Sequence, residues 1–225
     1  MNGERSNTQA DLDEQVCERG VKDWLEAWHR WYLGIPENRH PSLSHFSHER
    51  RQDQEQGKLS LLGSKESRAP KKCGSKVWFL TGGNQEKITT RSFIPPGNYY
   101  VLAPIYAAWA STDEYPSLNS VEELNDYCDH DIEGVKLTAT LDGQDLSPDQ
   151  IKIDKPFSVG LPVQNILGLK VPGKKGKRTI KIVSNGFWIW LKPLPIGDHK
   201  LHLHGSSPSF DSELNLSLSV AGPEG

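Results

Sequence analysis

The chain has 225 residues, with 26 basic and 29 acidic side chains and a net charge of -3 at pH 7. This near balance excludes a general attraction to nucleic acid or to an anionic membrane surface, and no apolar stretch of about 18 residues is present that could cross a membrane. The hydrophobic content of 35% and the mean hydropathy of -0.60 are low for a compact domain, which implies that a polar segment lies outside the core.

The N-terminal sequence MNGERSNTQADLDEQV lacks an apolar run after a basic start. We therefore expect no secretory signal, a cytoplasmic protein and a disordered tail over residues 1–10. The three cysteines, Cys17, Cys73 and Cys128, occur without a CxxC or a Cys/His ligand pattern. Reduced thiols are the simplest interpretation of this odd number.

Helical periodicity marks residues 11–36, which end at Ile35-Pro36. Apolar side chains recur there at spacings of three and four: Cys17, Val21, Trp24, Leu25, Trp28, Trp31 and Tyr32. Three tryptophans in one stripe could bind a ligand, but an amphipathic helix gains stability mainly by burying its apolar face, so we interpret the stripe as core. The polar composition of residues 37–75 predicts a loop or a partly disordered insertion.

Strand signals recur over residues 76–221 and predict a mainly β domain. The expected strands are Val77–Thr81, Tyr99–Pro104, Lys136–Leu141, Ile151–Ile153, Phe157–Leu161, Thr179–Ser184, Phe187–Lys192, Lys200–His204 and Leu214–Val220. Short connections favour antiparallel pairing, so we expect an antiparallel β-sandwich, jelly-roll-like or immunoglobulin-like. A turn is expected at Asp142-Gly143, and a short helix over Val121 to His130, where Ser120 and Glu123 form a capping box.

The pair Asn185-Gly186 lies between two β-branched or aromatic runs, which is the strongest short-range signal for a two-residue hairpin turn. A turn there would direct the isoleucines of both strands to one face, as core. The opposite face would carry four other side chains: Lys181, Val183, Trp188 and Trp190. This tryptophan-rich face would meet either another part of the chain or a ligand.

His202 and His204 lie on one face of an expected strand, because strand side chains alternate with a period of two. Two such imidazoles can bind a metal, but no further ligand has diagnostic spacing, so we expect none and name these two residues as ligands if a metal binds. A short connection usually joins neighbouring strands, which predicts that the histidines lie beside Trp188 and Trp190. The alternative is that the N-terminal helix covers the tryptophans and forms a second small core.

The loop from Trp109 to Tyr115 follows a hydrophobic strand and carries Asp113 and Glu114. Desolvation by the flanking aromatic rings would raise a carboxyl pKa there toward a value useful for acid/base chemistry. His130, next to aspartates at a helix C-terminus, is another candidate for proton transfer.

From these residues we expect an enzyme without an organic cofactor, an acid/base isomerase, cyclase or lyase that acts on a small, partly apolar organic molecule. The expected catalytic residues are Asp113, His130 and His202. The expected substrate-binding residues are Trp109, Tyr115, Lys181, Trp188, Trp190 and His204. The alternatives are a non-catalytic carbohydrate- or ligand-binding β-sandwich module that uses the tryptophans as stacking platforms, and a protein-interaction domain. A homodimer is left open.

Three segments, VWFLTGG, RSFIPPGNYYVLAPI and GFWIWLKPLPIGDHKLHLHG, together resemble a family of β-rich, mostly bacterial proteins with a tryptophan-rich N-terminal helix before an Ile-Pro. The resemblance extends from about Trp24 to Val220. It implies a β-rich fold and no particular activity. Many members of that family are secreted, whereas this chain shows no export signal and has the polar insertion at residues 37–75.

Overall fold

The fold is a sandwich of two mixed β-sheets with one helix on its outer face and another at its end. The computed structural model describes residues 6–40, 75–82, 87–172, 176 and 178–222. The first sheet has the order β1-β3-β7-β6 and the second β2-β9-β8-β4-β5. The bounds are α1 Val21–Leu33, η1 Glu37–Arg39, β1 Ser75–Phe79, β2 Lys87–Ile94, β3 Asn98–Ala110, α3 Val121–Asp131, β4 Lys136–Leu141, β5 Gln144–Asp145, β6 Asp149–Leu161, β7 Arg178–Leu191, β8 Gly197–Ser207 and β9 Phe210–Val220.

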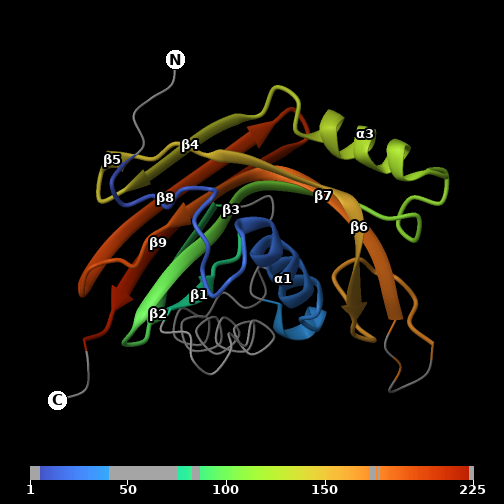
Figure 1. The fold of residues 1–225 in the computed structure, drawn as a ribbon. Helices are drawn as coiled ribbons and strands as arrows, with labels where there is room; N and C mark the ends of the chain where they lie inside the picture. Colours follow the sequence, from blue (N-terminus) through green and yellow to red (C-terminus); the bar gives the residue numbers. More distant parts are fainter. Residues whose placement is uncertain (1–5, 41–74, 83–86, 173–175, 177, 223–225) are drawn as a thin grey trace.

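Three layers result, and Figure 1 shows the strands of the first sheet arching over α1, with α3 on the opposite side of β6 and β7. One core lies between α1 and the first sheet, a second between the two sheets, and a third under α3. The predicted mainly β sandwich with an N-terminal helix is confirmed. Its sheets are not purely antiparallel, however, since β1 pairs with β3 and β2 with β9 in parallel.

The N-terminal helix is shorter than its periodicity predicts. Cys17 and Glu18 have positive φ angles of 58° and 61°, a conformation that no helix accommodates. Gly20 then caps the helix, where its backbone N–H donates to the Asp23 carboxylate at 3.1 Å. The helix therefore begins at Val21 rather than at residue 11.

The segment before the helix is attached to the end of β7. The backbone N–H of Ala10 donates to the Trp190 carbonyl, and that of Lys192 donates to the Thr8 carbonyl, both at 2.9 Å. The Gln9 side chain is buried and makes two hydrogen bonds to the Ser147 backbone. Residues 8–10 thus belong to the folded body, although the sequence predicted a tail there.

The cysteines differ from one another in oxidation state. Cys17 takes part in a disulfide, so the prediction of reduced thiols is wrong for it. Cys128 is free and buried on the inner side of α3. The remaining cysteine and most of the polar segment predicted over residues 37–75 lie outside the described residues.

β7 is one continuous strand, and the predicted hairpin at Asn185-Gly186 is wrong. Asn185 pairs with Ala108 on β3 and with Lys152 on β6, so the chain continues straight through the pair. Side chains consequently alternate along the whole strand. One face packs on α1 through Ile180, Ile182, Trp188 and Trp190, and the other packs on α3 or the second sheet through Val183, Phe187, Ile189 and Leu191.

The glycine that signalled a turn serves a close backbone approach instead. The neighbouring strand β3 has a bulge between Pro104 and Tyr106, and beyond it Ala107 pairs with Gly186. A Cβ atom at this glycine would lie 2.5 Å from the Tyr106 carbonyl oxygen and 2.8 Å from Ala107 Cα. Only glycine fits this position without a shift of β3.

Other local signals were interpreted correctly. The turn at Asp142-Gly143 joins β4 to β5, and both residues have positive φ, 52° and 80°. The second helix begins where predicted, since Ser120 Oγ accepts a hydrogen bond from the Glu123 backbone N–H at 3.1 Å. β8 is displaced from its expected place, because the chain crosses at residues 192–196 from the first sheet to the second.

The substitution Gly186→Ala tests the close approach of β3 and β7. We expect it to lower the free energy of unfolding by about 2 kcal/mol, since overpacking of a core costs about 1–3 kcal/mol. Gly160→Ala is the matched control, because this glycine lies in β6 of the same sheet with nothing within 4 Å of its added Cβ. Urea unfolding of both variants measures the difference. Equal stabilities would contradict the tight contact.

Candidate functional site

The two strand tryptophans belong to the core and do not line a pocket. Trp188 and Trp190 are both 0% exposed. The ring of Trp28 on α1 lies edge-on against Trp188, with centroids 5.0 Å apart, and Tyr100 stacks on Trp190 at 5.2 Å. The alternative left open by the sequence, in which the helix covers these residues, is the observed arrangement. The predicted tryptophan-lined pocket is therefore wrong.

The three residues expected to be catalytic lie in separate parts of the molecule. Asp113, in the loop after β3, forms an ion pair with Arg178 at the start of β7. His130 is on α3, where its side chain is 88% exposed and faces Glu133 at 3.4 Å. His202 lies on β8, on the outer face of the second sheet, and contacts Glu213 at 3.3 Å. The fold brings none of these side chains into contact with another.

The His202 and His204 pair is co-oriented as predicted but lies away from the tryptophans. Their neighbours Leu201 and Leu203 point into the core between the sheets, so the histidines face outward. Each imidazole has its own carboxylate, since His204 Nε2 lies 2.8 Å from Asp211. Within the described residues, no three His, Cys, Asp or Glu side chains are arranged to hold a metal ion.

The remaining predicted binding residues also separate. Trp109 is half-buried against α1, and Lys181 is exposed on the opposite face of the first sheet. Tyr115 accepts a hydrogen bond from the Tyr127 hydroxyl at 2.8 Å. Burial raises the pKa of Glu114, although a hydrogen bond from Ser111 opposes this rise. The predicted desolvation of a carboxyl in this loop is thus confirmed for Glu114.

A buried histidine and serine form a pair that the sequence analysis missed. His29 Nδ1 lies 2.8 Å from the Leu25 carbonyl oxygen, and its Nε2 lies 3.0 Å from Ser184 Oγ. Ser184 Oγ also lies 2.9 Å from the Ala108 carbonyl oxygen. A neutral imidazole and one hydroxyl supply two protons for these three contacts, so the serine can donate to only one of its neighbours. Both side chains are sealed from solvent, which makes the pair a structural element and not a nucleophile with its base.

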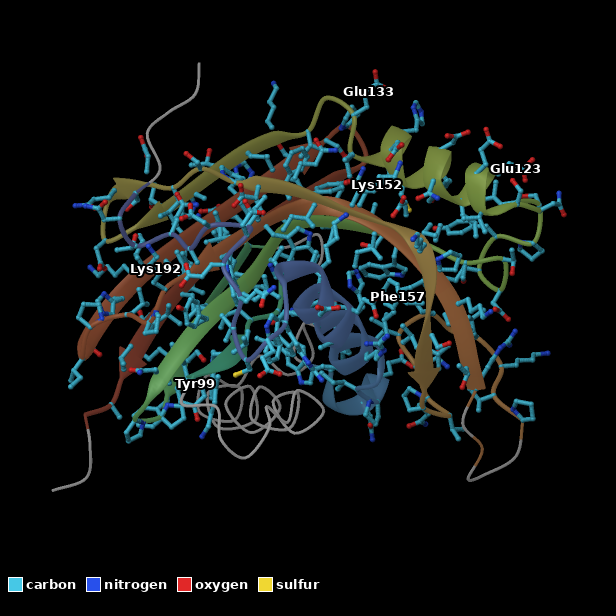
Figure 2. The ribbon with its side chains drawn as sticks, in the orientation of Figure 1. Tyr99, Glu123, Glu133, Lys152, Phe157 and Lys192 are labelled. Atoms are coloured by element: carbon cyan, nitrogen blue, oxygen red, sulfur yellow. The ribbon has the colours of Figure 1, made fainter. Side chains whose placement is uncertain are left out.

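A groove lies where the C-terminal end of α3 crosses β6 and β7. Its volume is about 310 Å³, and it is lined by Asp129, Ile132, Glu133, Gln150, Lys152, Asn185 and Phe187. Figure 2 shows Lys152 next to α3 and Glu133 at the end of that helix. The register of β7 aligns Asn185 with Lys152 and Phe187 with Gln150, which puts these four side chains in two adjacent rows.

The polar groups of the groove form one connected network. Asp129 accepts hydrogen bonds from Lys152 Nζ at 2.6 Å and from Asn185 Nδ2 at 2.7 Å. Asn185, itself buried, accepts in turn from the Gly186 backbone N–H at 2.9 Å and from Gln150 at 3.4 Å. Desolvation alone would raise the pKa of Asp129, but the hydrogen bonds from Lys152 and Asn185 outweigh it and lower the pKa. The carboxylate is therefore ionised at neutral pH.

A second hollow adjoins the groove. It has a volume of about 240 Å³ and is lined by Tyr106, Ala107, Asp131, Ser209 and Phe210. The Tyr106 hydroxyl donates to Asp131 at 3.2 Å, and its ring lies edge-on to Phe210 with centroids 5.0 Å apart. Tyr106 is also the register partner of Phe187 on the neighbouring strand, so the two hollows lie near each other on this face of the first sheet.

The sequence carried only partial signals for this site. The aspartates next to His130 in the sequence are Asp129 and Asp131, and each lines one of the two hollows. Asn185 was interpreted as a turn residue. A buried asparagine inside a strand is unusual, because an amide costs free energy unless it is hydrogen-bonded. The presence of an asparagine between two apolar strand segments is therefore the sequence signal that could have located the groove.

Comparisons with known proteins add little to this geometry. No family model matches the chain, and no curated protein matches it. Among solved structures, amebosin matches with 15% identity over 64% of this chain and 96% of its own, at a TM-score of 0.26. The cysteine protease inhibitor EhICP2 from Entamoeba histolytica matches with 13% identity over 65% of this chain and 96% of its own, at a TM-score of 0.21. Such low TM-scores carry no argument about function.

Neither helix among the described residues has the length and apolar character needed to span a membrane.

The buried histidines predict a loss of stability in acid. Burial lowers the pKa of His29 from 6.5 to about 4, and burial likewise lowers the pKa of His40 to about 4. Between pH 6.5 and pH 4 the unfolded chain binds protons that the folded chain does not, so stability falls as the pH falls through this window. For His29 alone the loss is about 2 kcal/mol at a pH of about 4.5.

The variant His29→Gln measures this contribution, because glutamine can bond to Ser184 without titrating. We expect its unfolding free energy, from urea titrations near pH 7 and pH 4.5, to depend on pH less steeply than that of the unsubstituted protein. His130→Gln, at an exposed position, is the control and should leave the slope unchanged. An unchanged slope in His29→Gln would contradict the assignment of a neutral buried imidazole.

Proposed function

We propose that this protein is a non-catalytic binding module whose groove at the end of α3 holds a carbohydrate. The observation that carries the proposal is the hydrogen-bonded network of Asp129, Lys152, Asn185 and Gln150 beside the half-exposed ring of Phe187. An open groove with a few converging polar groups and an apolar wall is the usual form of a small-ligand site.

The donors and acceptors suit a polyhydroxylated ligand. A carboxylate has about four acceptor positions, of which Asp129 uses two for Lys152 and Asn185, and its side chain remains 44% exposed. Neighbouring hydroxyl groups of a sugar can donate to the remaining positions. The ammonium of Lys152, whose side chain is half-buried, and the amide of Gln150 can donate to the sugar oxygens. The apolar face of a pyranose ring packs well on an aromatic ring such as Phe187.

The arrangement favours binding over acid/base chemistry. General acid/base catalysis works best with a group whose pKa lies near the working pH. The hydrogen bonds from Lys152 and Asn185 lower the pKa of Asp129 despite desolvation, and this moves it away from that range. The expected catalytic trio of Asp113, His130 and His202 does not line the groove. We therefore choose the carbohydrate-binding alternative over the isomerase, cyclase or lyase hypothesis.

Calorimetric titration with neutral trisaccharides tests this proposal. The probes are cellotriose, maltotriose, mannotriose and chitotriose. We expect at least one to bind in the micromolar to millimolar range, since about -4 kcal/mol of binding free energy corresponds to a millimolar dissociation constant. If none binds below about 10 mM, the proposal is rejected.

Matched variants locate the site. Asp129→Asn keeps the shape of the side chain but removes the charge, and we expect it to weaken binding about tenfold, since charge-assisted hydrogen bonds contribute about 1.5–3 kcal/mol. Phe187→Leu removes the aromatic face but keeps apolar volume. Phe93→Leu is the control, because this ring is 54% exposed on β2, in the other sheet. Equal affinities in all three variants would place the ligand elsewhere and contradict the proposed groove.

A further inference from the structure

The site has two compartments of similar chemistry. The groove contains an aromatic ring, a carboxylate from α3 and amides, namely Phe187, Asp129, Asn185 and Gln150. The adjoining hollow contains two aromatic rings, another carboxylate from α3 and a hydroxyl, namely Tyr106, Phe210, Asp131 and Ser209. Each volume, about 310 and about 240 Å³, lies at or below the lower end of the roughly 300–1,000 Å³ typical of sites for drug-sized ligands. Each compartment therefore suits one small unit of a ligand.

The fold fixes the spacing between the compartments. Tyr106 and Phe187 are register partners on β3 and β7, and paired residues on antiparallel strands have Cα atoms about 4.5–5.5 Å apart. Asp131 and Ile132, one from each lining, are adjacent where α3 ends. The two compartments are therefore close enough for two ring-sized units linked head to tail to occupy one each.

The charges of the two compartments favour a neutral chain. Lys152 is the one cation among the lining residues of both compartments, and its charge is balanced by Asp129 at 2.6 Å. Asp131 and the exposed Glu133 add negative charge. An anionic sugar such as a uronate would be repelled by these carboxylates, because like charges in a shared site disfavour one another.

We infer that the site binds a neutral oligosaccharide across two consecutive sugar units, one in each compartment, and binds a free monosaccharide more weakly. This inference rests on the proposed carbohydrate-binding function. Two linked units that occupy adjoining compartments gain affinity without a second loss of translational freedom, so the gain with chain length reports the number of compartments in use.

The test compares chain lengths and compartments. Calorimetry measures the affinity for glucose, cellobiose and cellotriose, and for the corresponding mono-, di- and trimers of the other sugars that bind. We expect the disaccharide to bind at least about tenfold more tightly than its monosaccharide, with a smaller gain from the third unit. Phe210→Leu, in the second hollow, should remove the gain from the second unit and weaken the disaccharide more than the monosaccharide. Phe187→Leu should weaken both ligands.

The outcomes separate this inference from the proposed function. If mono- and disaccharides bind with equal affinity, or if Phe210→Leu keeps the full gain, the two-compartment inference is overturned and the carbohydrate-binding function stands. If no sugar of any length binds, the proposed function fails and the inference fails with it. Melting curves of each variant must match the unsubstituted protein. Should Phe210→Leu unfold, Asp131→Asn replaces it, since this carboxylate lines the same hollow.

Discussion

The aromatic contact between α1 and β7 determines which surfaces of this protein are available to a ligand. Trp28 stacks on Tyr32 with centroids 4.6 Å apart, meets Trp188 edge-on at 5.0 Å, and donates its indole N–H to the Leu80 carbonyl at 2.7 Å. Edge-on and stacked aromatic pairs contribute about 0.5–1.5 kcal/mol beyond the area they bury. Because the helix covers this face of the first sheet around Trp188, that part of the face is closed to a ligand, and the candidate groove lies on the other face.

The other face of the first sheet is only partly covered, because β3 contains a bulge. The bulge between Pro104 and Tyr106 turns both Ile105 and Tyr106 toward the second sheet, a reorientation typical of β-bulges. Beyond the bulge, α3 replaces the second sheet as the covering element, and it covers less. The groove and its neighbouring hollow occupy the uncovered strip between helix and sheet. The same bulge needs Gly186, so the backbone contact and the candidate site are two consequences of one feature.

The sequence predicted the elements that depend on local chemistry and missed those that depend on distant partners. Ser120 and Glu123 predicted the start of α3, and Asp142-Gly143 predicted a turn. Both predictions hold because helix caps and tight turns depend on residues only a few positions apart. Asn185-Gly186 carried the same kind of turn signal, but its conformation is decided by β3 and β6 on either side. Because a turn was predicted at that pair, Trp188 and Trp190 were predicted to lie on the face opposite the core isoleucines. The candidate site, which joins α3 to β6 and β7, matches no sequence motif.

The electrostatics of the groove support the proposed binding function more than catalysis. Asp129 holds a fixed negative charge, because hydrogen bonds from Lys152 and Asn185 stabilise its carboxylate against desolvation. The carboxyl whose pKa burial raises, Glu114, bonds to Ser111 in the loop after β3 and is absent from the linings of both compartments. Proton transfer to a ligand in the groove would need a carboxyl with a raised pKa, like that of Glu114, at the position that Asp129 occupies. The raised pKa and the position in the groove belong to different residues. The groove can therefore orient hydroxyl groups through a charge that stays constant, and its affinity for a ligand should not change through the neutral pH range.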